Sequence, residues 1–217
     1  MTGMFIAFEG GEGSGKTSAI AEALETIENI TGRKVVRTRE PGGTPNAEQI
    51  RSILISEGAD HDNICNTLLF AAARRDHVER LIRPRLAAGD WVITDRYVLS
   101  TLAYQGAEGV DKDFIQRLHI DTTDGLLPDH TIILDVDPRI GLGRSTARLA
   151  GEGSNESRFE GYDLAFHDRM RGIMLEYDLS AKTIIDASRS QAEVIADVKK
   201  TVENLVNHWR EIERTGA

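Results

Sequence analysis

One cysteine, Cys65, is the only thiol in this chain of 217 residues, so no internal disulfide can form. A lone cysteine is typical of proteins from a reducing compartment. The N-terminus has no basic segment followed by a long apolar run, and no stretch approaches the length of a membrane span. These absences predict a cytoplasmic protein without a membrane partner.

The chain also lacks excess positive charge. Lysine and arginine number 26 against 35 aspartate and glutamate residues, which gives a net charge of −9. An acidic surface of this size disfavours binding to nucleic acid. The six histidines show no metal-ligand spacing and are interpreted as structural or surface residues. A phosphate-binding site in this chain must therefore gather its positive charge locally.

Short apolar runs alternate with longer amphipathic ones, which is typical of an α/β fold with a parallel sheet. The predicted strands cover residues 4–9, 34–38, 91–95, 131–136 and 182–187. The predicted helices cover residues 16–30, 47–55, 64–88 with a bend at Pro84, 97–105, 111–122, 138–149, 160–179 and 190–213. The pattern predicts one domain over residues 1–217.

Residues 8–18, FEGGEGSGKTS, form a glycine-rich stretch between the first predicted strand and the first predicted helix. The stretch fits the phosphate-loop pattern G-x-x-x-x-G-K-[ST], and its strand–loop–helix context is the one that the pattern needs. Glycines let backbone N–H groups surround a phosphate, and the helix N-terminus adds partial positive charge. Lys16 would bind the β- and γ-phosphates, and the Thr17 hydroxyl would ligate Mg²⁺. The predicted triphosphate-binding residues are Gly10, Gly11, Glu12, Gly13, Ser14, Gly15, Lys16, Thr17 and Ser18.

Several arginines indicate a second anion. Arg39 and Arg96 follow the C-terminal ends of predicted parallel strands, the edge at which open α/β sheets bind ligands. Arg51 and Arg74 lie in the predicted helices that follow, and guanidinium groups suit phosphate binding. Asp95 ends the third strand, where a carboxylate commonly orients Mg²⁺. A guanine-reading N-K-x-D motif is absent, which favours a kinase over a GTPase.

Five segments resemble, in order and spacing, the successive signatures of the thymidylate kinase family. They are FEGGEGSGKT (8–17), TREPGGT (38–44), LLFAAARRDH (68–77), DRYVLSTLAYQG (95–106) and GLLPDHTIILDVDP (125–138). The resemblance implies a three-layer α/β/α P-loop fold with a five-stranded parallel sheet, usually in a homodimer. It also implies Mg²⁺-dependent transfer of the γ-phosphate of ATP to thymidine monophosphate (dTMP).

The resemblance assigns roles to residues around the acceptor. Phe70 would stack on the thymine ring and Arg74 would bind its carbonyl edge. Glu9 would lie near the sugar 3′-hydroxyl and the metal, and Tyr104 would crowd the sugar C2′ atom of a ribonucleotide. The predicted substrate-binding residues are Glu9, Arg39, Glu40, Pro41, Arg51, Phe70, Arg74, Arg96, Ser100, Thr101, Tyr104 and Gln105.

Residues 144–160 resemble the family's mobile lid. The variable positions of the phosphate loop hold no basic residue, so the resemblance implies that a lid arginine supplies the catalytic charge. Arg148 and Arg158 are both candidates, and Arg144 is the third lid cation. The predicted metal ligands are Thr17 and Asp95, and the predicted catalytic residues are Lys16, Asp95, Arg96, Arg148 and Arg158.

Two other functions stay open. A kinase for another nucleoside monophosphate, or for deoxynucleosides, would share the phosphate loop, although a deoxynucleoside would leave Arg51 and Arg96 without a phosphate to bind. A P-loop ATPase that acts on a protein partner would hydrolyse ATP without dependence on dTMP. The intact Lys16, Thr17 and Asp95 argue against a structural protein with an inert loop.

Overall fold

The computed structural model describes residues 3–56, 60–152 and 162–215. A single five-stranded sheet has the order β2-β3-β1-β4-β5, and all of its strand pairs are parallel. The strands are β1 (Phe5–Glu9), β2 (Val35–Arg39), β3 (Trp91–Asp95), β4 (His130–Asp135) and β5 (Lys182–Asp186). The predicted α/β fold with a five-stranded parallel sheet is confirmed.

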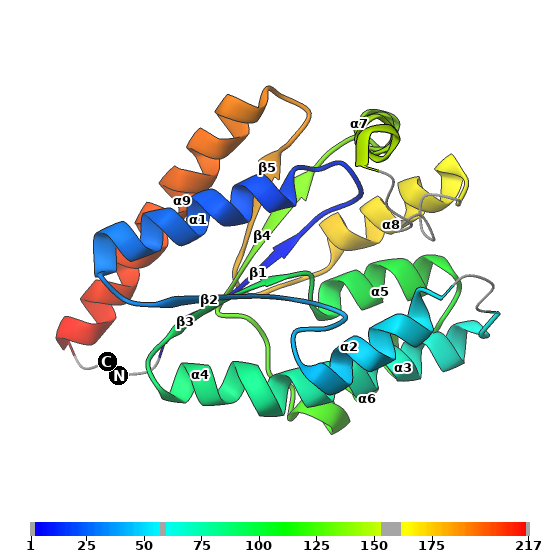
Figure 1. The fold of residues 1–217 in the computed structure, drawn as a ribbon, viewed down its shortest axis with the longest axis horizontal. Helices are drawn as coiled ribbons and strands as arrows, with labels where there is room; N and C mark the ends of the chain where they lie inside the picture. Colours follow the sequence, from blue (N-terminus) through cyan, green and yellow to red (C-terminus); the bar gives the residue numbers. More distant parts are fainter. Residues whose placement is uncertain (1–2, 57–59, 153–161, 216–217) are drawn as a thin grey trace.

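Helices cover both faces of the sheet (Figure 1). One face carries α1 (Lys16–Thr31) and α9 (Gln191–Thr215), which lie side by side. The opposite side carries α3 (Asn63–His77), α5 (Val98–Ala107), α6 (Lys112–Thr123) and α8 (Leu164–Glu176). Two further helices follow strands at their carboxyl ends, α2 (Pro45–Leu54) after β2 and α7 (Pro138–Glu152) after β4. Among these described helices, none is both long and apolar enough to cross a membrane.

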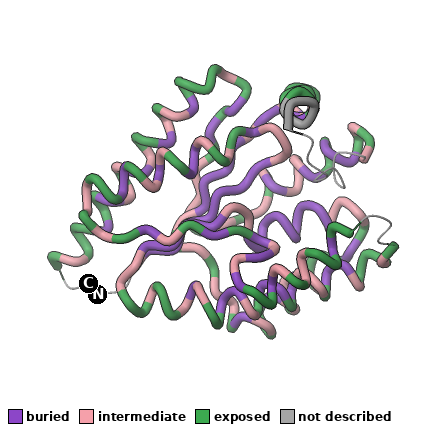
Figure 2. Tube along the Cα trace, viewed as in Figure 1, coloured by how far each residue is buried: buried purple, intermediate pink, exposed green. Residues whose placement is uncertain are grey.

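Apolar side chains at four-residue spacing hold α9 on the sheet. They are Val194, Val198, Val202 and Val206. These valines form one stripe of the helix and pack in the same cluster as Ile20 of α1 and Ile6 and Phe8 of β1. Every residue of β1 is buried, as expected for a parallel strand that is covered on both faces (Figure 2). The sheet is therefore a rigid base for the loops at its edge.

The long helix predicted over residues 64–88 consists of three parts. The N-terminal part is α3, which Asp62 caps by accepting a hydrogen bond from the Cys65 N–H at 2.8 Å. A wide π-helical turn, η1 (Val78–Ile82), joins α3 to a short helix, α4 (Arg83–Ala87). The proline ring of Pro84 would clash with the carbonyl four residues earlier in a regular helix, and a wider turn just before it relieves that crowding. The irregularity thus lies immediately before the predicted bend at Pro84.

Because all five strands are parallel, their carboxyl ends meet at one edge of the sheet. The loops that follow β1, β2 and β3 carry the glycine-rich stretch, the 38–44 segment and Arg96. Hydrogen bonds tie two of these loops to the end of the neighbouring strand, from the Glu40 N–H to the Asp95 carbonyl of β3 and from the Arg96 N–H to the Phe8 carbonyl of β1, both at 2.9 Å. The predicted site residues therefore meet at this edge.

Candidate active site

A cavity of about 1040 Å³ opens at the carboxyl edge of the sheet. Its walls come from the phosphate loop, the end of β2, α3, the end of β3 and α5. The predicted residues that line it are Glu12, Gly13, Ser14, Gly15, Lys16, Thr17, Ser18, Arg39, Glu40, Pro41, Arg51, Phe70, Arg74, Asp95, Arg96, Ser100, Thr101, Tyr104 and Gln105. The expected donor and acceptor residues thus face one shared space. The sequence pattern did not single out Arg37, which lines the same cavity.

The phosphate loop wraps around the ammonium group of its own lysine. Gly10, Gly13 and Gly15 adopt φ values of 147°, 65° and 86°, which L side chains rarely adopt. Lys16 Nζ donates to the Gly10 carbonyl at 2.9 Å and to the Gly11 carbonyl at 3.1 Å. Burial and the nearby charge of Arg96 lower the pKa of Lys16 to about 8. The loop therefore holds a cation whose charge an incoming phosphate would stabilise.

Arg96 joins the acceptor side of the cavity to the phosphate loop. Its backbone has a φ of 67°, a left-handed conformation that is uncommon for a residue with a Cβ atom. Its guanidinium pairs with the Glu12 carboxylate at 3.0 Å and donates to the Gly10 carbonyl and the Ser100 hydroxyl, each at 3.1 Å. The Tyr104 hydroxyl donates to the same carboxylate at 2.7 Å. Glu12 is therefore the counter-ion of Arg96, the residue that the sequence predicted to bind the acceptor phosphate.

Opposing effects act on the Glu12 carboxyl. Burial raises the pKa of this group, but the charges of Arg96 and Lys16 outweigh burial and hold the pKa below its ordinary value. Glu12 is thus ionised at neutral pH and partly offsets the charge of two cations.

Glu9 lies beneath the cavity, fully buried behind Ser100. One carboxylate oxygen accepts the backbone N–H groups of Tyr97 at 2.8 Å and Ser100 at 3.2 Å, and the other accepts the Ser100 hydroxyl at 2.5 Å. Burial raises the pKa of Glu9 to about 7, although the Ser100 hydroxyl and Arg96 oppose this effect. Glu9 therefore fixes the β3–α5 turn and does not itself line the cavity, although it was predicted to bind the substrate.

Arg74 is held from below by a buried polar network. Its Nε donates to Glu40 Oε2 at 2.7 Å, and its Nη2 donates to the Thr101 hydroxyl at 2.8 Å. The other oxygen of Glu40 lies 3.0 Å from His77 Nδ1, and His77 Nε2 lies 2.7 Å from the Thr38 hydroxyl. Arg74 and His77 are both less than 5% exposed, so this network fixes the direction of the guanidinium.

His77 was not among the predicted site residues. The signal that indicates it is the helical spacing, because residues 70, 74 and 77 lie on one face of α3. Phe70 is only half-buried and lines the cavity one turn before Arg74, as the spacing predicted.

The segment after β2 is anchored at several points. The Thr44 hydroxyl donates to Asp76 of α3 at 2.5 Å, and Arg39 pairs with Glu48 of α2 at 3.1 Å on the exposed side. Arg51 Nη1 donates to the Pro41 carbonyl at 3.0 Å. Because these contacts fix the loop on α2 and α3, they also direct Arg51 toward the cavity that it lines.

The similarity to known proteins can now be set beside this geometry. The family model of thymidylate kinase matches residues 8–198. A thymidylate kinase of Cereibacter sphaeroides is 48% identical over 200 residues, covering 89% of this chain and 91% of the relative. One of Magnetococcus marinus is 41% identical over 218 residues, covering 98% and 97%. The chain belongs to the thymidylate kinase family.

Family membership identifies the chain as a phosphotransferase that uses ATP, which confirms the resemblance found in the sequence. The alternative of a P-loop ATPase that acts only on a protein partner is thereby disfavoured.

The residues of this kinase suit a magnesium ion. Asp95 Oδ1 is buried and has no hydrogen-bond partner within the described part of the chain. Thr17 stands in the first turn of α1 and lines the same cavity. No group of three or more histidine, cysteine or acidic residues that could hold a metal exists among the described residues. A few oxygen ligands completed by water and phosphate are what Mg²⁺ prefers, so the donor set fits that ion.

The predicted lid of the kinase begins as a helix. Residues 144–152 continue α7, and the Arg144 guanidinium donates to the carbonyls of Ala187 at 2.7 Å and Ser188 at 3.1 Å. Arg144 therefore holds the loop between β5 and α9 against α7. The side chains of residues 148–161 lie outside the described residues, so the predictions for Arg148 and Arg158 stay predictions.

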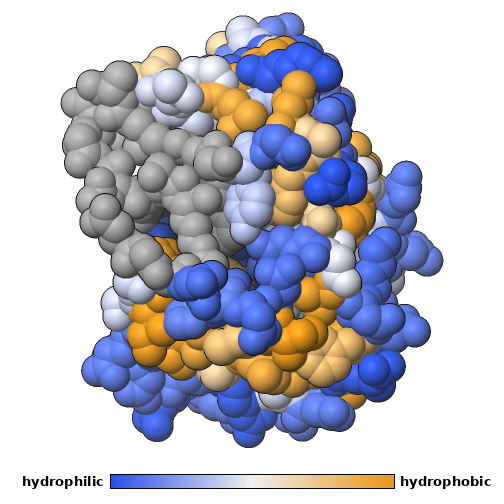
Figure 3. Space-filling model, turned by 90° about the vertical axis from the view of Figure 1, so that its right-hand side faces the viewer, coloured by the Kyte–Doolittle hydropathy of each residue, from blue (hydrophilic) through white to orange (hydrophobic). Residues whose placement is uncertain are grey.

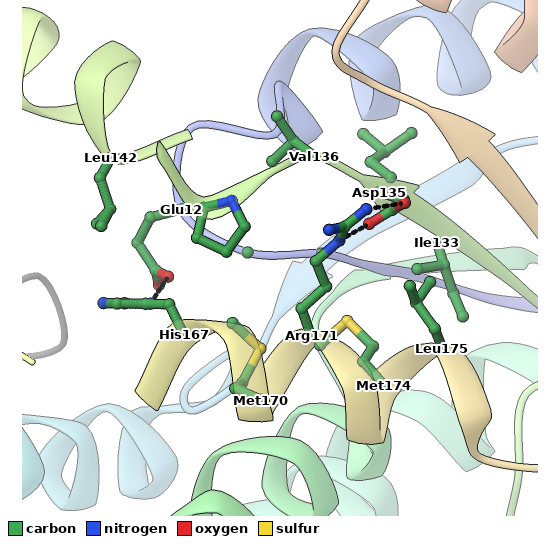
Figure 4. A pocket seen from close by; sticks show the side chains of 14 residues that line it. Glu12, Ile133, Asp135, Val136, Leu142, His167, Met170, Arg171, Met174 and Leu175 are labelled. Carbon is green, nitrogen blue, oxygen red and sulfur yellow. Dashed lines mark hydrogen bonds and ion pairs between the residues drawn. The ribbon is translucent and has the colours of Figure 1, made fainter. Parts of the chain in front are cut away.

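A second, small cavity of about 20 Å³ lies behind the phosphate loop of the kinase (Figure 4). His167 of α8 lines it, only 2% exposed, and its Nδ1 lies 3.9 Å from Glu12 Oε2. Its Nε2 is buried and has no hydrogen-bond partner among the residues described. Arg171 pairs with Asp135 across the same cavity at 2.6 Å. The sequence pattern did not single out His167, because it lies outside the phosphate-loop and arginine motifs.

Proposed function

We propose that the chain transfers the γ-phosphate of ATP to dTMP, giving ADP and thymidine diphosphate for dTTP synthesis. The observation that carries this proposal is the single cavity lined both by Lys16 and by Phe70, Arg74 and Arg96. A triphosphate on the loop and a monophosphate beside Arg96 would meet end to end in that space. The name of the family and of the curated relatives supports the same reaction.

The acceptor wall suits a pyrimidine monophosphate. Phe70 offers an apolar ring face, and the guanidinium of Arg74, fixed by Glu40 and Thr101, offers a donor for a base carbonyl. Tyr104 is 5% exposed and held by Glu12, so its ring would limit the room beside the sugar and favour a deoxyribose. Lining residues that support these contacts are Ser100, Thr101 and Gln105.

The reaction needs charge compensation and positioning more than it needs a base. The acceptor phosphate is already ionised at neutral pH and attacks the γ-phosphorus directly, with ADP as the leaving group. Arg96 would exchange its Glu12 partner for the acceptor phosphate, and Arg51 would bind the same phosphate from the β2–α2 side. Lys16 would bind the γ-phosphate and stabilise its charge during the transfer.

Thr17 and Asp95 would hold Mg²⁺, which when bound neutralises charge on the donor phosphates. A lid arginine, Arg148 or Arg158, would add charge from the open side, as the family resemblance implies.

A panel of nucleoside monophosphates tests the proposal. Purified protein is given ATP and Mg²⁺ with each acceptor in turn, and ADP release is followed in a coupled assay. We expect turnover with dTMP and much less with the other acceptors. ATP consumption that is independent of any nucleotide acceptor, or a clear preference for another monophosphate, would overturn it. Omission of Mg²⁺ tests the metal separately.

We also propose a homodimer, as expected for the family. Large apolar side chains that stay exposed on or near the neighbouring helices α2, α3 and α6 are Ile53, Ile55, Ile64, Leu68 and Ile120. On the face shown in Figure 3, apolar side chains form a broad area below the grey residues. Such a patch is typical of an interface. Ile64→Glu should then convert a dimer to a monomer in sedimentation velocity, and a monomeric wild type would refute the proposal.

We place the enzyme in the cytoplasm, where the free Cys65 stays reduced.

A further inference from the structure

Two glycines let α7 touch the backbone of the phosphate loop. A Cβ atom built on Gly141 in the first turns of α7 would lie 2.4 Å from the Glu12 carbonyl oxygen and 3.1 Å from Val136 Cγ1. A Cβ atom on Gly13 would lie 2.0 Å from the Gly141 carbonyl oxygen. The two backbones are therefore closer than any side chain would allow.

The contact is not an accident of a glycine-rich helix. Gly143, two residues later in α7, is exposed, and a Cβ atom there would meet nothing within 4 Å. Glycine in a helix interior lowers helix stability relative to alanine, so a buried glycine at position 141 needs a packing reason. Close approach to the loop is that reason at Gly141 and is absent at Gly143.

α7 also has a second anchor, because Arg144 binds the carbonyls at the start of the β5–α9 loop one turn beyond Gly141. The helix thus bridges the phosphate loop and the β5–α9 loop before it continues into residues 145–152. Figure 1 shows α7 beside the loop that joins β1 to α1.

We propose that Gly141 is a positioning residue for phosphoryl transfer. Its missing side chain lets α7 rest on the Glu12–Gly13 peptide, so that the phosphate loop and α7 move as one unit when the loop binds ATP. The proposal rests on the proposed kinase function and deepens it, because it names the residue that couples donor binding to the position of α7.

The size of the expected effect follows from the contact distance. Relief of a 2.4 Å contact to an ordinary one of 3.4 Å separates α7 from the loop by about 1 Å. Both partners are backbone, so no side-chain rotation can absorb the shift. A misplacement of about 1 Å near the reacting groups can reduce turnover by about 10²-fold.

Gly141→Ala is the test, and Gly143→Ala on the same helix is its matched control. Both variants gain the same helix propensity, but only the first adds a methyl group against the loop. We measure kcat, KM for ATP, the Kd for dTMP by calorimetry, and Tm. For Gly141→Ala we expect kcat/KM for ATP to fall by about 10- to 100-fold, with the Kd for dTMP within twofold of wild type. For Gly143→Ala we expect wild-type kinetics and a Tm higher by about 1–4 °C.

A purely structural role would lower the Tm of Gly141→Ala and leave kcat/KM of the folded enzyme unchanged at a temperature well below Tm, and that result overturns the proposal. Equal kinetic losses in both variants also overturn it. If Gly141→Ala does not fold, hydrogen exchange of the wild type decides. A non-hydrolysable ATP analogue should slow exchange of amides 140–145 together with those of the loop, and unchanged exchange in α7 refutes the coupling. If dTMP is not the acceptor, the Kd for ATP measured by calorimetry still tests Gly141, because its contact lies on the loop that would bind the donor.

Discussion

The buried carboxyl of Glu9 should make the enzyme less stable at high pH, and Glu9→Gln should remove that loss. Glu9 is fully buried and accepts three hydrogen bonds from Tyr97 and Ser100. A glutamine has nearly the same shape, its oxygen can accept both backbone N–H groups, and its NH₂ group can donate to the Ser100 hydroxyl. The substitution therefore keeps the contacts and removes only the titration.

The magnitude follows from the pKa of Glu9, which burial raises from 4.5 to about 7. A raised pKa means that the folded protein holds the proton more tightly, so stability is full below pH 4.5 and is lost as the pH rises through 7. The loss attributable to Glu9 is about 1 kcal/mol at pH 5 and about 3 kcal/mol at pH 8, since each pKa unit corresponds to 1.36 kcal/mol. The advantage of Glu9→Gln over wild type should thus grow by about 2 to 3 kcal/mol between these pH values.

Urea-induced unfolding at pH 5 and pH 8, followed by circular dichroism, measures this difference. Other titrating groups contribute equally to wild type and variant, so they cancel in the comparison. Glu25→Gln on the exposed side of α1 is the control for the same change in net charge. A difference in the free energy of unfolding that stays constant with pH, or that shrinks as the pH rises, would show that the pKa of Glu9 is not raised in the folded protein.

Three further predictions concern the cations and their support. Arg96→Ala and Arg96→Gly should both lower kcat by about 10³-fold. The glycine variant should have the higher free energy of unfolding, by about 1 kcal/mol, because φ at this position is 67°. Equal stabilities of the two variants in urea would contradict backbone strain at Arg96. His77→Leu should lower the free energy of unfolding by about 2 kcal/mol and raise KM for dTMP more than it lowers kcat, since it removes the His77 partner of Glu40 Oε1 and of the Thr38 hydroxyl. An unchanged KM in steady-state kinetics would refute this role. ATP should bind the wild type about tenfold more weakly at pH 9 than at pH 7, because Lys16, with a pKa of about 8, loses its proton. In calorimetry, the Kd of Lys16→Arg for ATP should not change between these pH values.

The local pattern of the chain was enough to predict the fold and the positions of the glycine-rich loop and of residues 70 and 74. The strand predicted over residues 91–95 has the same bounds as β3, and the glycine pattern placed the phosphate loop between β1 and α1. Helical spacing put Phe70 and Arg74 on one face of α3, where both line the cavity. These features depend on periodicity and on backbone conformation, which neighbouring residues largely determine.

The remaining features depend on partners that are distant in the chain. Arg96 meets Glu12 across 84 positions, and His77 meets Glu40 across 37. Apolar spacing specifies which face of a helix is buried, but it does not specify which charged group lies opposite. The π-helical turn before Pro84 was missed for a related reason, because residue spacing does not fix the hydrogen-bond register of a helix.

The electrostatics of the site suit the binding of phosphates. Burial is the largest cause of the lowered pKa of Lys16, and the charge of Arg96 lowers this pKa further. The carboxylates of Asp95, Glu12 and Glu9 oppose both effects only in part. Phosphate groups of a donor and an acceptor would supply counter-charge to both cations at once and would free Glu12 from Arg96. This arrangement of cations would therefore favour two anionic nucleotides that meet end to end, which is the geometry that in-line phosphoryl transfer requires.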